Sequence, residues 1–117
     1  ELDRRQRQMC IRDRGVTAIV EQLRAKTPET KILLLATFPR GPDASDAKRI
    51  VNTKSNAIVA KLADDDHVFY LDIADQFLAD DGTLSKDIMP DLLHLSDKGY
   101  TIWAESIEPT LSKLLAE

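Results

Sequence analysis

The sequence predicts an α/β fold in which helices cover a parallel sheet. Two apolar runs, KILLLATF (31–38) and HVFYLDI (67–73), have the length and composition of strands buried on both faces. Segments with apolar residues at helical spacing precede, separate and follow these runs. Because a helix between two neighbouring strands makes a right-handed parallel crossover, the predicted order of helix, strand, helix, strand, helix gives a layered α/β architecture.

The chain before the first predicted strand divides in two at Gly15. Residues 1–14, ELDRRQRQMCIRDR, are dense in charge and have no sustained apolar period. We expect them to form a charged N-terminal tail or a frayed lead-in helix that is foreign to the domain, which is expected to span residues 15–117. The first helix of the domain should end near Thr27 and Pro28. Its expected buried face consists of Val16, Ile19, Val20 and Leu23.

A second helix is predicted between the two strands. The segment PRGPDAS (39–45) is a loop, as its prolines and glycine indicate, and Ser45 is expected to cap the helix that follows. The acidic run at 64–66 should end this helix before the second strand begins. Its expected apolar stripe consists of Ala47, Ile50, Val51, Ile58 and Leu62, with Lys54 as the polar member.

A third helix is predicted from about Ser96, which is expected to be its N-cap. The segment that leads from the second strand to this helix contains the turn pair Asp81-Gly82. Pro109 should kink or restart the helix, because proline removes one backbone donor. The side chains expected to point inward are Tyr100, Trp103, Ala104, Ile107, Leu111 and Leu114.

Two strands make a poor parallel sheet, because both faces and both edges need cover. No internal repeat in the sequence supplies further strands. We therefore expect an incomplete domain, the second half of a doubly wound fold. The exposed sheet edge should favour self-association of the chain.

Composition narrows the classes of function. The 117 residues suffice for one small domain, and 43% hydrophobic with 31% charged residues is typical of a soluble globular protein. The formal net charge of −4, without a basic cluster beyond the N-terminus, gives no electrostatic reason to expect a nucleic acid partner. The run Ile32–Ala36 is too short to span a membrane, and Cys10 has no second cysteine with which to form an internal disulfide. No signal peptide is visible, so a cytoplasmic location and export by an upstream signal both stay open.

The segment MPDLLHLSDKGY (89–100) holds the pattern that suggests chemistry. Its Asp91 precedes His94 by three residues, in a loop that follows the second strand and thus lies toward the carboxyl edge of the sheet. A carboxylate at this spacing can hold the Nδ1 proton of the imidazole, so that Nε2 can accept a proton from a nucleophile. The alternative is an aspartate-capped turn with a surface histidine. The other histidine, His67, opens a strand beside the acidic run and is expected to lie at the surface.

Five blocks of sequence carry a wider resemblance: KILLLATFPRG, VFYLDI, DGTL, IMPDLLHLSDKGY and WAESIEPTLSKLL. Together they resemble the C-terminal half of the SGNH hydrolases, the GDSL esterase/lipase family, and within it the branch of the platelet-activating-factor acetylhydrolase catalytic subunits. The resemblance implies an incomplete flavodoxin-like three-layer α/β/α fold and serine-based hydrolysis of small acyl esters. It implies that His94 is the general base, that Asp91 orients it, and that no metal or organic cofactor takes part. Arg40, in the P-R-G segment, is expected at the rim of the site, to bind substrate or to fix its loop by a salt bridge.

The sequence departs from this family at the nucleophile. The family takes its serine from a Gly-Asp-Ser segment near the start of the domain, and oxyanion donors from a Gly-x-Asn block. Neither is present here, and the serines at 45, 55, 85, 96, 106 and 112 lack such neighbours. We therefore expect the chain to be the C-terminal portion of an esterase for acetyl-type esters of a lipid or carbohydrate, inactive alone. The alternative is a non-catalytic α/β interaction module derived from the same fold.

Overall fold

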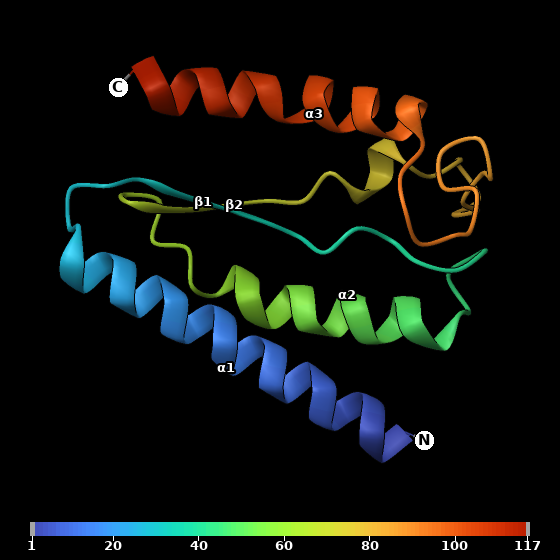
Figure 1. Cartoon of the computed structure of the whole chain (residues 1–117), viewed down its shortest axis with the longest axis horizontal. Coiled ribbons are helices and arrows are strands. Elements are labelled where there is room, and N and C mark those ends of the chain that lie inside the picture. The colour runs from blue at the N-terminus through green and yellow to red at the C-terminus, as the bar shows by residue number, and fades with distance from the viewer. Residues whose placement is uncertain (1, 117) are drawn as a thin grey trace.

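The structure, a computed structural model, describes residues 2–116 and has three layers. The two-stranded sheet lies between α1 and α2 on one side and α3 on the other (Figure 1). The elements, in chain order, are α1 (Leu2–Lys26), β1 (Ile32–Leu35), α2 (Ala47–Ala60), β2 (Val68–Leu71), the short 3₁₀ helix η1 (Ala74–Gln76) and α3 (Asp97–Ala116). The prediction of an α/β fold is confirmed.

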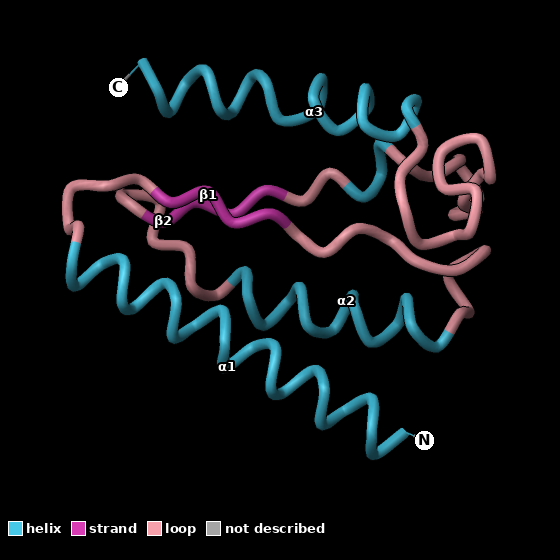
Figure 2. Tube along the Cα trace, in the orientation of Figure 1, coloured by secondary structure: helices cyan, strands magenta, loops and turns pink. Residues whose placement is uncertain are grey.

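The two strands pair in parallel, as the crossover argument predicted. Ile32 lies opposite Val68 and Leu35 opposite Leu71. The N–H of Ile32 donates to the carbonyl of His67 at 2.7 Å, one of the bonds that set this register. Because both strands run in the same direction, the loops that follow them gather at one end of the molecule (Figure 2).

The main core lies beyond the carboxyl ends of the strands. Phe77 and Met89 are each 1% exposed, and Ile73 and Leu84 are each 5% exposed. The ring of Phe38 lies 4.8 Å from that of Phe77, between centroids. Three of the four buried side chains follow η1 or belong to the long loop before α3, so this core fastens the loop that carries Asp91 and His94 to the sheet.

Helix α1 differs from the prediction in extent and in its buried face. The helix runs through Gly15 without a break, while Ile19 and Leu23 are exposed, so the predicted face is wrong at these two positions. Val20 is buried, as predicted. Asp13, which was not part of the predicted face, is buried too and accepts a 2.6 Å hydrogen bond from Ser55 of α2. The buried stripe therefore passes through a carboxylate. The assignment of residues 1–14 to a foreign tail stays a prediction.

Helix α2 begins after Asp46, not after Ser45. The carboxylate of Asp46 accepts hydrogen bonds from the backbone N–H groups of Lys48 and Arg49, as an N-cap does. The Ser45 hydroxyl is bonded to Asp43. The predicted stripe is wrong at Ala47, which is exposed, and at Ile50 and Ile58, which are 42% and 43% exposed. The buried residues of α2 are Arg49, Ser55 and Val59.

Helix α3 begins where it was predicted, and its N-cap is Ser96, whose hydroxyl accepts a 3.2 Å hydrogen bond from the N–H of Gly99. The helix continues through Pro109. Tyr100 is 55% exposed, and Ala104 and Leu111 are exposed too, so the predicted inward positions of these three side chains are wrong. Trp103 is partly buried against Phe38, and its Nε1 has no partner among the residues that the structure describes. No helix in the described part of the chain is both long and apolar enough to cross a membrane.

Candidate functional site: a histidine–carboxylate pair at the carboxyl edge of the sheet

The loop that carries Asp91 and His94 is closed at its base by hydrogen bonds. Backbone N–H groups of Ile88 and Met89 both donate to the carbonyl of Ser85, at 3.1 Å each. At the other end, the N–H of Ser96 donates to the carbonyl of Ile88 at 2.8 Å, and the Ser96 hydroxyl donates to that of Asp87 at 2.5 Å. With Met89 in the core, these bonds fix both ends of the loop.

Leu92, between Asp91 and His94, has a left-handed backbone conformation with φ of 60°. This region is unfavourable for a branched side chain and is retained where the surrounding structure enforces it. The surroundings here include a 2.9 Å hydrogen bond from the Leu92 N–H to the carbonyl of Met89 and a 3.1 Å bond from the Gly41 N–H to the carbonyl of Leu92. The second bond ties this loop to the loop that follows β1.

The carboxylate of Asp91 is the centre of the pair. Its Oδ1 accepts the backbone N–H groups of Leu93 at 3.0 Å and of His94 at 2.7 Å. Its Oδ2 lies 2.6 Å from Nδ1 of His94. The His94 imidazole, followed by the backbone N–H of His94, holds the pKa of the Asp91 carboxyl well below its usual range. An ionised Asp91 is therefore the state that the loop favours.

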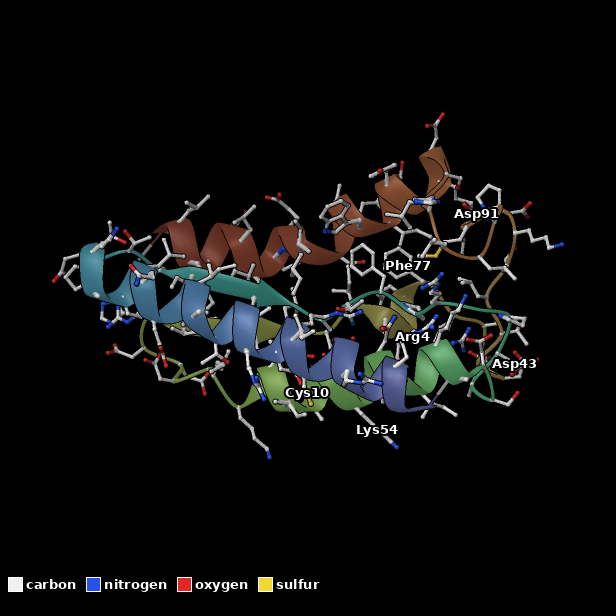
Figure 3. All side chains as sticks on the ribbon, turned by 60° about the horizontal axis from the view of Figure 1, so that its bottom comes forward. Arg4, Cys10, Asp43, Lys54, Phe77 and Asp91 are labelled. Atoms are coloured by element: carbon white, nitrogen blue, oxygen red, sulfur yellow. The ribbon has the colours of Figure 1, made fainter. Side chains whose placement is uncertain are left out.

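This contact determines how the imidazole is presented. With Nδ1 directed at the carboxylate, Nε2 is the nitrogen left for a reacting group. The side chain of His94 is 78% exposed, and within residues 2–116 the structure records no hydrogen bond to Nε2. Asp43 belongs to the loop after β1, and Asp91 lies at the same end of the molecule as this residue (Figure 3). An imidazole held in this way can act as a general base.

A second histidine–carboxylate pair shows that contact alone does not mark a site. Nδ1 of His67 lies 3.0 Å from Oδ2 of Asp66, in a tight turn. This pair precedes β2, so it lies at the amino end of the sheet, opposite to the edge where ligands bind in open α/β folds. We therefore assign no function to His67, as the sequence analysis expected.

Arg40 lies in the loop after β1. Its backbone carbonyl accepts a 3.1 Å hydrogen bond from Nε of Arg49. Within the described residues its guanidinium makes no recorded ion pair, so the salt bridge considered as an alternative is not observed. The arginine that fixes this loop is Arg49, which the sequence analysis missed. Its position in the first turn of a helix, among other charged residues, gave no signal of burial.

Four serine hydroxyls donate hydrogen bonds to other groups in the described part of the chain. Those of Ser45, Ser55 and Ser112 bond to nearby carboxylates, and that of Ser96 bonds to the loop backbone. The structure shows no serine hydroxyl bonded to His94 in the part of the chain that it describes. The same part contains no group of three or more histidine, cysteine, aspartate or glutamate side chains placed to hold a metal ion.

A hollow of about 510 Å³ lies beside α2 and the carboxyl end of β2. Its lining includes Thr37, Asn56, Tyr70 and Asp72, and neither Asp91 nor His94 contributes to it. The amide of Asn56 bridges the backbone of Thr37, donating to its carbonyl at 3.0 Å and accepting its N–H at 2.8 Å. The hollow is thus separate from the histidine–carboxylate pair.

Helices around a parallel sheet, with a histidine–carboxylate pair at its carboxyl edge, define an α/β protein of the class that includes many hydrolases. The model of the GDSL-like Lipase/Acylhydrolase family matches residues 2–102, and the chain belongs to this family. The recognition of this family from the sequence is confirmed.

Named relatives of this chain agree with the family assignment. Human platelet-activating factor acetylhydrolase IB subunit alpha1 is 31% identical over 103 residues, which cover 88% of this chain and 45% of the human protein. The rat subunit alpha2 is 34% identical over 107 residues, again covering 88% of this chain and 45% of the relative. The chain spans about half the length of the curated relatives it matches.

A solved structure from Streptococcus pneumonia, described as that of a platelet activating factor, resembles this chain with a TM-score of 0.73. The sequence identity is 24%, and the match covers 88% of this chain and 51% of the other. At this level of identity the likeness shows the fold.

Proposed function

We propose that Asp91 and His94 are the acid–base part of a Ser-His-Asp site that hydrolyses small acyl esters, of the acetyl type, on a lipid or carbohydrate. The observation that carries the proposal is the 2.6 Å contact between Asp91 Oδ2 and His94 Nδ1, with an exposed imidazole, at the carboxyl edge of the sheet. The family of lipases and acylhydrolases, and relatives named as acetylhydrolases, support an ester as substrate.

In the proposed reaction, a serine that the described residues do not provide attacks the ester carbonyl. His94 Nε2 takes the serine proton, and Asp91 stabilises the resulting imidazolium through Nδ1. The tetrahedral intermediate then collapses, and His94 gives the proton to the leaving alcohol. In the second half, water attacks the carbonyl of the acyl-serine while His94 takes its proton. The second tetrahedral intermediate collapses, His94 returns the proton to the serine oxygen, and the carboxylic acid is released. The loop that carries Asp91 and His94 therefore orients one proton acceptor, Nε2 of His94.

Arg40 is proposed to contact the substrate at the rim of this site, because its loop is tied to the His94 loop through Gly41 and Leu92. This arrangement brings residues 39–41 and 91–94 to one end of the sheet. A guanidinium there can bind an oxygen of the acyl group or of the alcohol.

A non-catalytic module is the second candidate. The observation that favours it is that no described serine is bonded to His94. Such a module would keep the fold of the acylhydrolases and bind a partner, with no hydrolysis in any combination with other chains.

The test is reconstitution of the complete domain. This chain is fused to, or mixed with, the part of the human relative that it does not cover, and hydrolysis of a short-chain acetyl ester is followed. We expect activity that falls by about a thousandfold or more with His94→Gln and by a comparable or smaller factor with Asp91→Asn, since such residues act as a unit.

The matched control is the other histidine–carboxylate pair. His67→Gln makes the same chemical change at the amino end of the sheet and should leave the rate within about twofold. A reconstituted, folded domain without esterase activity would favour the non-catalytic module. Equal losses in the His94 and His67 variants would remove His94 from the mechanism.

A further inference from the structure

Arg49 is a buried cation whose guanidinium binds the loop after β1. It lies in the first turn of α2 and is 6% exposed. A buried charge is costly unless hydrogen bonds replace the water it has lost. The partners of Arg49 therefore show what the structure gains by keeping it.

The partners are backbone carbonyls from two separate loops. Nε donates to the carbonyl of Arg40 at 3.1 Å, and Nη2 donates to that of Gly41 at 2.8 Å. Nη1 donates to the carbonyl of Gly82, in the turn that follows η1. The planar guanidinium thus joins the loop after β1 to the loop after β2, a geometry that a lysine ammonium cannot reproduce.

Gly41 transmits this anchoring to the proposed site. Its carbonyl accepts from Arg49, and its N–H donates to the carbonyl of Leu92 at 3.1 Å. Only glycine suits this position, because φ is +80° and a Cβ would lie 2.3 Å from Cγ of Asp46. Both backbone polar groups of Gly41 are therefore hydrogen-bonded. The carbonyl binds the buried Arg49, and the N–H binds the loop that carries Asp91 and His94.

Leu92 completes the path. It follows Asp91, its strained conformation turns the chain toward His94, and its carbonyl is held by Gly41. We infer that Arg49 is a positioning residue for the Asp91–His94 pair, acting through Gly41 and Leu92. The catalytic meaning of this role rests on the proposed function, whereas the mechanical link between Arg49 and the pair does not.

The experiment uses the full chain, with Arg49→Lys and Arg49→Gln. Two-dimensional NMR follows hydrogen exchange at the N–H groups of Gly41 and His94, together with the Nδ1 proton of the His94 imidazole. We expect exchange at Gly41 to accelerate at least about tenfold in Arg49→Gln, equivalent to about 1.4 kcal/mol. The Nδ1 proton signal of His94 should broaden or vanish, while that of His67 stays unchanged as an internal reference.

The lysine variant separates the effect of the hydrogen bonds to the loop carbonyls from the effect of the positive charge at position 49. Lysine keeps the cation but reaches fewer carbonyls, so we expect it to show the same changes at Gly41 and His94, to a smaller degree. Arg12→Gln is the matched control, because the recorded hydrogen bond of Arg12 goes to the side chain of Asn52 in α2, at 3.0 Å, and to neither loop. This control should leave both sets of signals as they are in the unmodified chain.

Unchanged exchange at Gly41 and an unchanged His94 imidazole signal in a folded Arg49→Lys or Arg49→Gln protein would overturn the inference. If both variants fail to fold, exchange in the unmodified chain decides the question. An Arg49 Nε–H or a Gly41 N–H that exchanges as fast as a free group would overturn the inference, and protection of both would uphold it. None of these readouts needs ester hydrolysis. A failure of the proposed function therefore leaves a different result from a failure of this inference.

Discussion

Asp91 combines two tasks that are usually separated, because one of its oxygens forms the turn and the other holds the imidazole. Oδ1 binds the backbone N–H groups of Leu93 and His94, which fixes the chain, and Oδ2 binds Nδ1 of His94. The turn thereby sets the position of the ring that the same residue orients. This coupling explains how a pair that is more than half exposed on both sides can still be well defined.

A first prediction concerns the pH dependence of this residue. The carboxyl of Asp91 has a lowered pKa in the folded chain, whereas an unfolded aspartate titrates near about 3.9. The folded state thus binds fewer protons there, so the contribution of Asp91 to stability is complete above about pH 4 and is lost as the pH falls toward its folded pKa. Carbon-13 titration of the Asp91 carboxyl should give a midpoint clearly below about 3.9.

The matched comparison is urea unfolding of the unmodified chain and of Asp91→Asn. The difference in unfolding free energy between the two, measured from about pH 5 downward, should shrink as the pH falls below about 4. A difference that does not change down to about pH 3 would show that the ionised carboxylate does not stabilise the loop.

At this scale the sequence was informative about contacts within one turn and silent about contacts across the fold. The spacing of Asp91 and His94 predicted that the carboxylate would reach the imidazole, and the structure brings them together. Their catalytic roles stay a prediction. Arg49 could not be found in this way, because its partners at Gly41 and Gly82 become neighbours only after the loops have folded.

At the scale of elements, α3 holds the site loop by close approach of its first turn. Gly99 is buried in that turn, and a Cβ there would lie 2.7 Å from the carbonyl oxygen of Ile88 and 2.8 Å from Leu95. The same Ile88 carbonyl accepts the N–H of Ser96. The absence of a side chain at 99 therefore lets the helix pack directly on the backbone that carries His94.

A second prediction concerns two glycine substitutions that should change the stability of the chain in opposite directions. Gly99→Ala should destabilise the chain by about 1–3 kcal/mol, because the backbone carbonyl of Ile88 cannot move aside cheaply. Gly15→Ala should stabilise it by about 0.5–1 kcal/mol, since Gly15 lies inside α1 with nothing within 4 Å of its Cβ position. Thermal unfolding followed by circular dichroism measures both, and a stabilised Gly99→Ala protein would contradict the close packing.

The elements themselves were predictable, but the faces of the helices were not. The two apolar runs gave strands close to β1 and β2, because a strand buried on both faces needs an unbroken run of apolar residues. On α1 and α2, apolarity pointed to Ile19 and Ile58, which are exposed. The buried positions include Asp13 and Ser55, two polar groups that satisfy each other, and such a pair is invisible until the helices are docked.

At the scale of the whole molecule, the two edges of the sheet differ. The outer edge of β2 is partly closed at its start, because the carbonyl of Val68 accepts the N–H groups of Asp64 and Asp65. The carboxylate of Asp64 in turn accepts three backbone N–H groups, led by that of Val68, which lowers the pKa of the Asp64 carboxyl. A charged turn of this kind discourages a further strand.

The edge of β1 has no such protection among the described residues. The N–H groups of Ile32 and Ala36 point to β2, so the alternation of a parallel ladder directs those of Leu33 and Leu35 to the opposite side. The sheet contains only two strands, so that side has no partner strand in the described part of the chain. An apolar strand with free donors and acceptors is a template for pairing with another chain.

A third prediction is therefore that this chain self-associates through β1 with a second copy. Leu33→Pro removes an outward N–H and places a ring where the second copy would pair, a change that edge strands tolerate. Leu33→Ala is the matched control, because it also removes the leucine side chain but keeps the backbone N–H. Size-exclusion chromatography with light scattering, over about a hundredfold range of concentration, should show association for the unmodified chain and for Leu33→Ala but not for Leu33→Pro. A compact monomer of the unmodified chain throughout that range, or equal association of the two variants, would show that the β1 edge is not the contact.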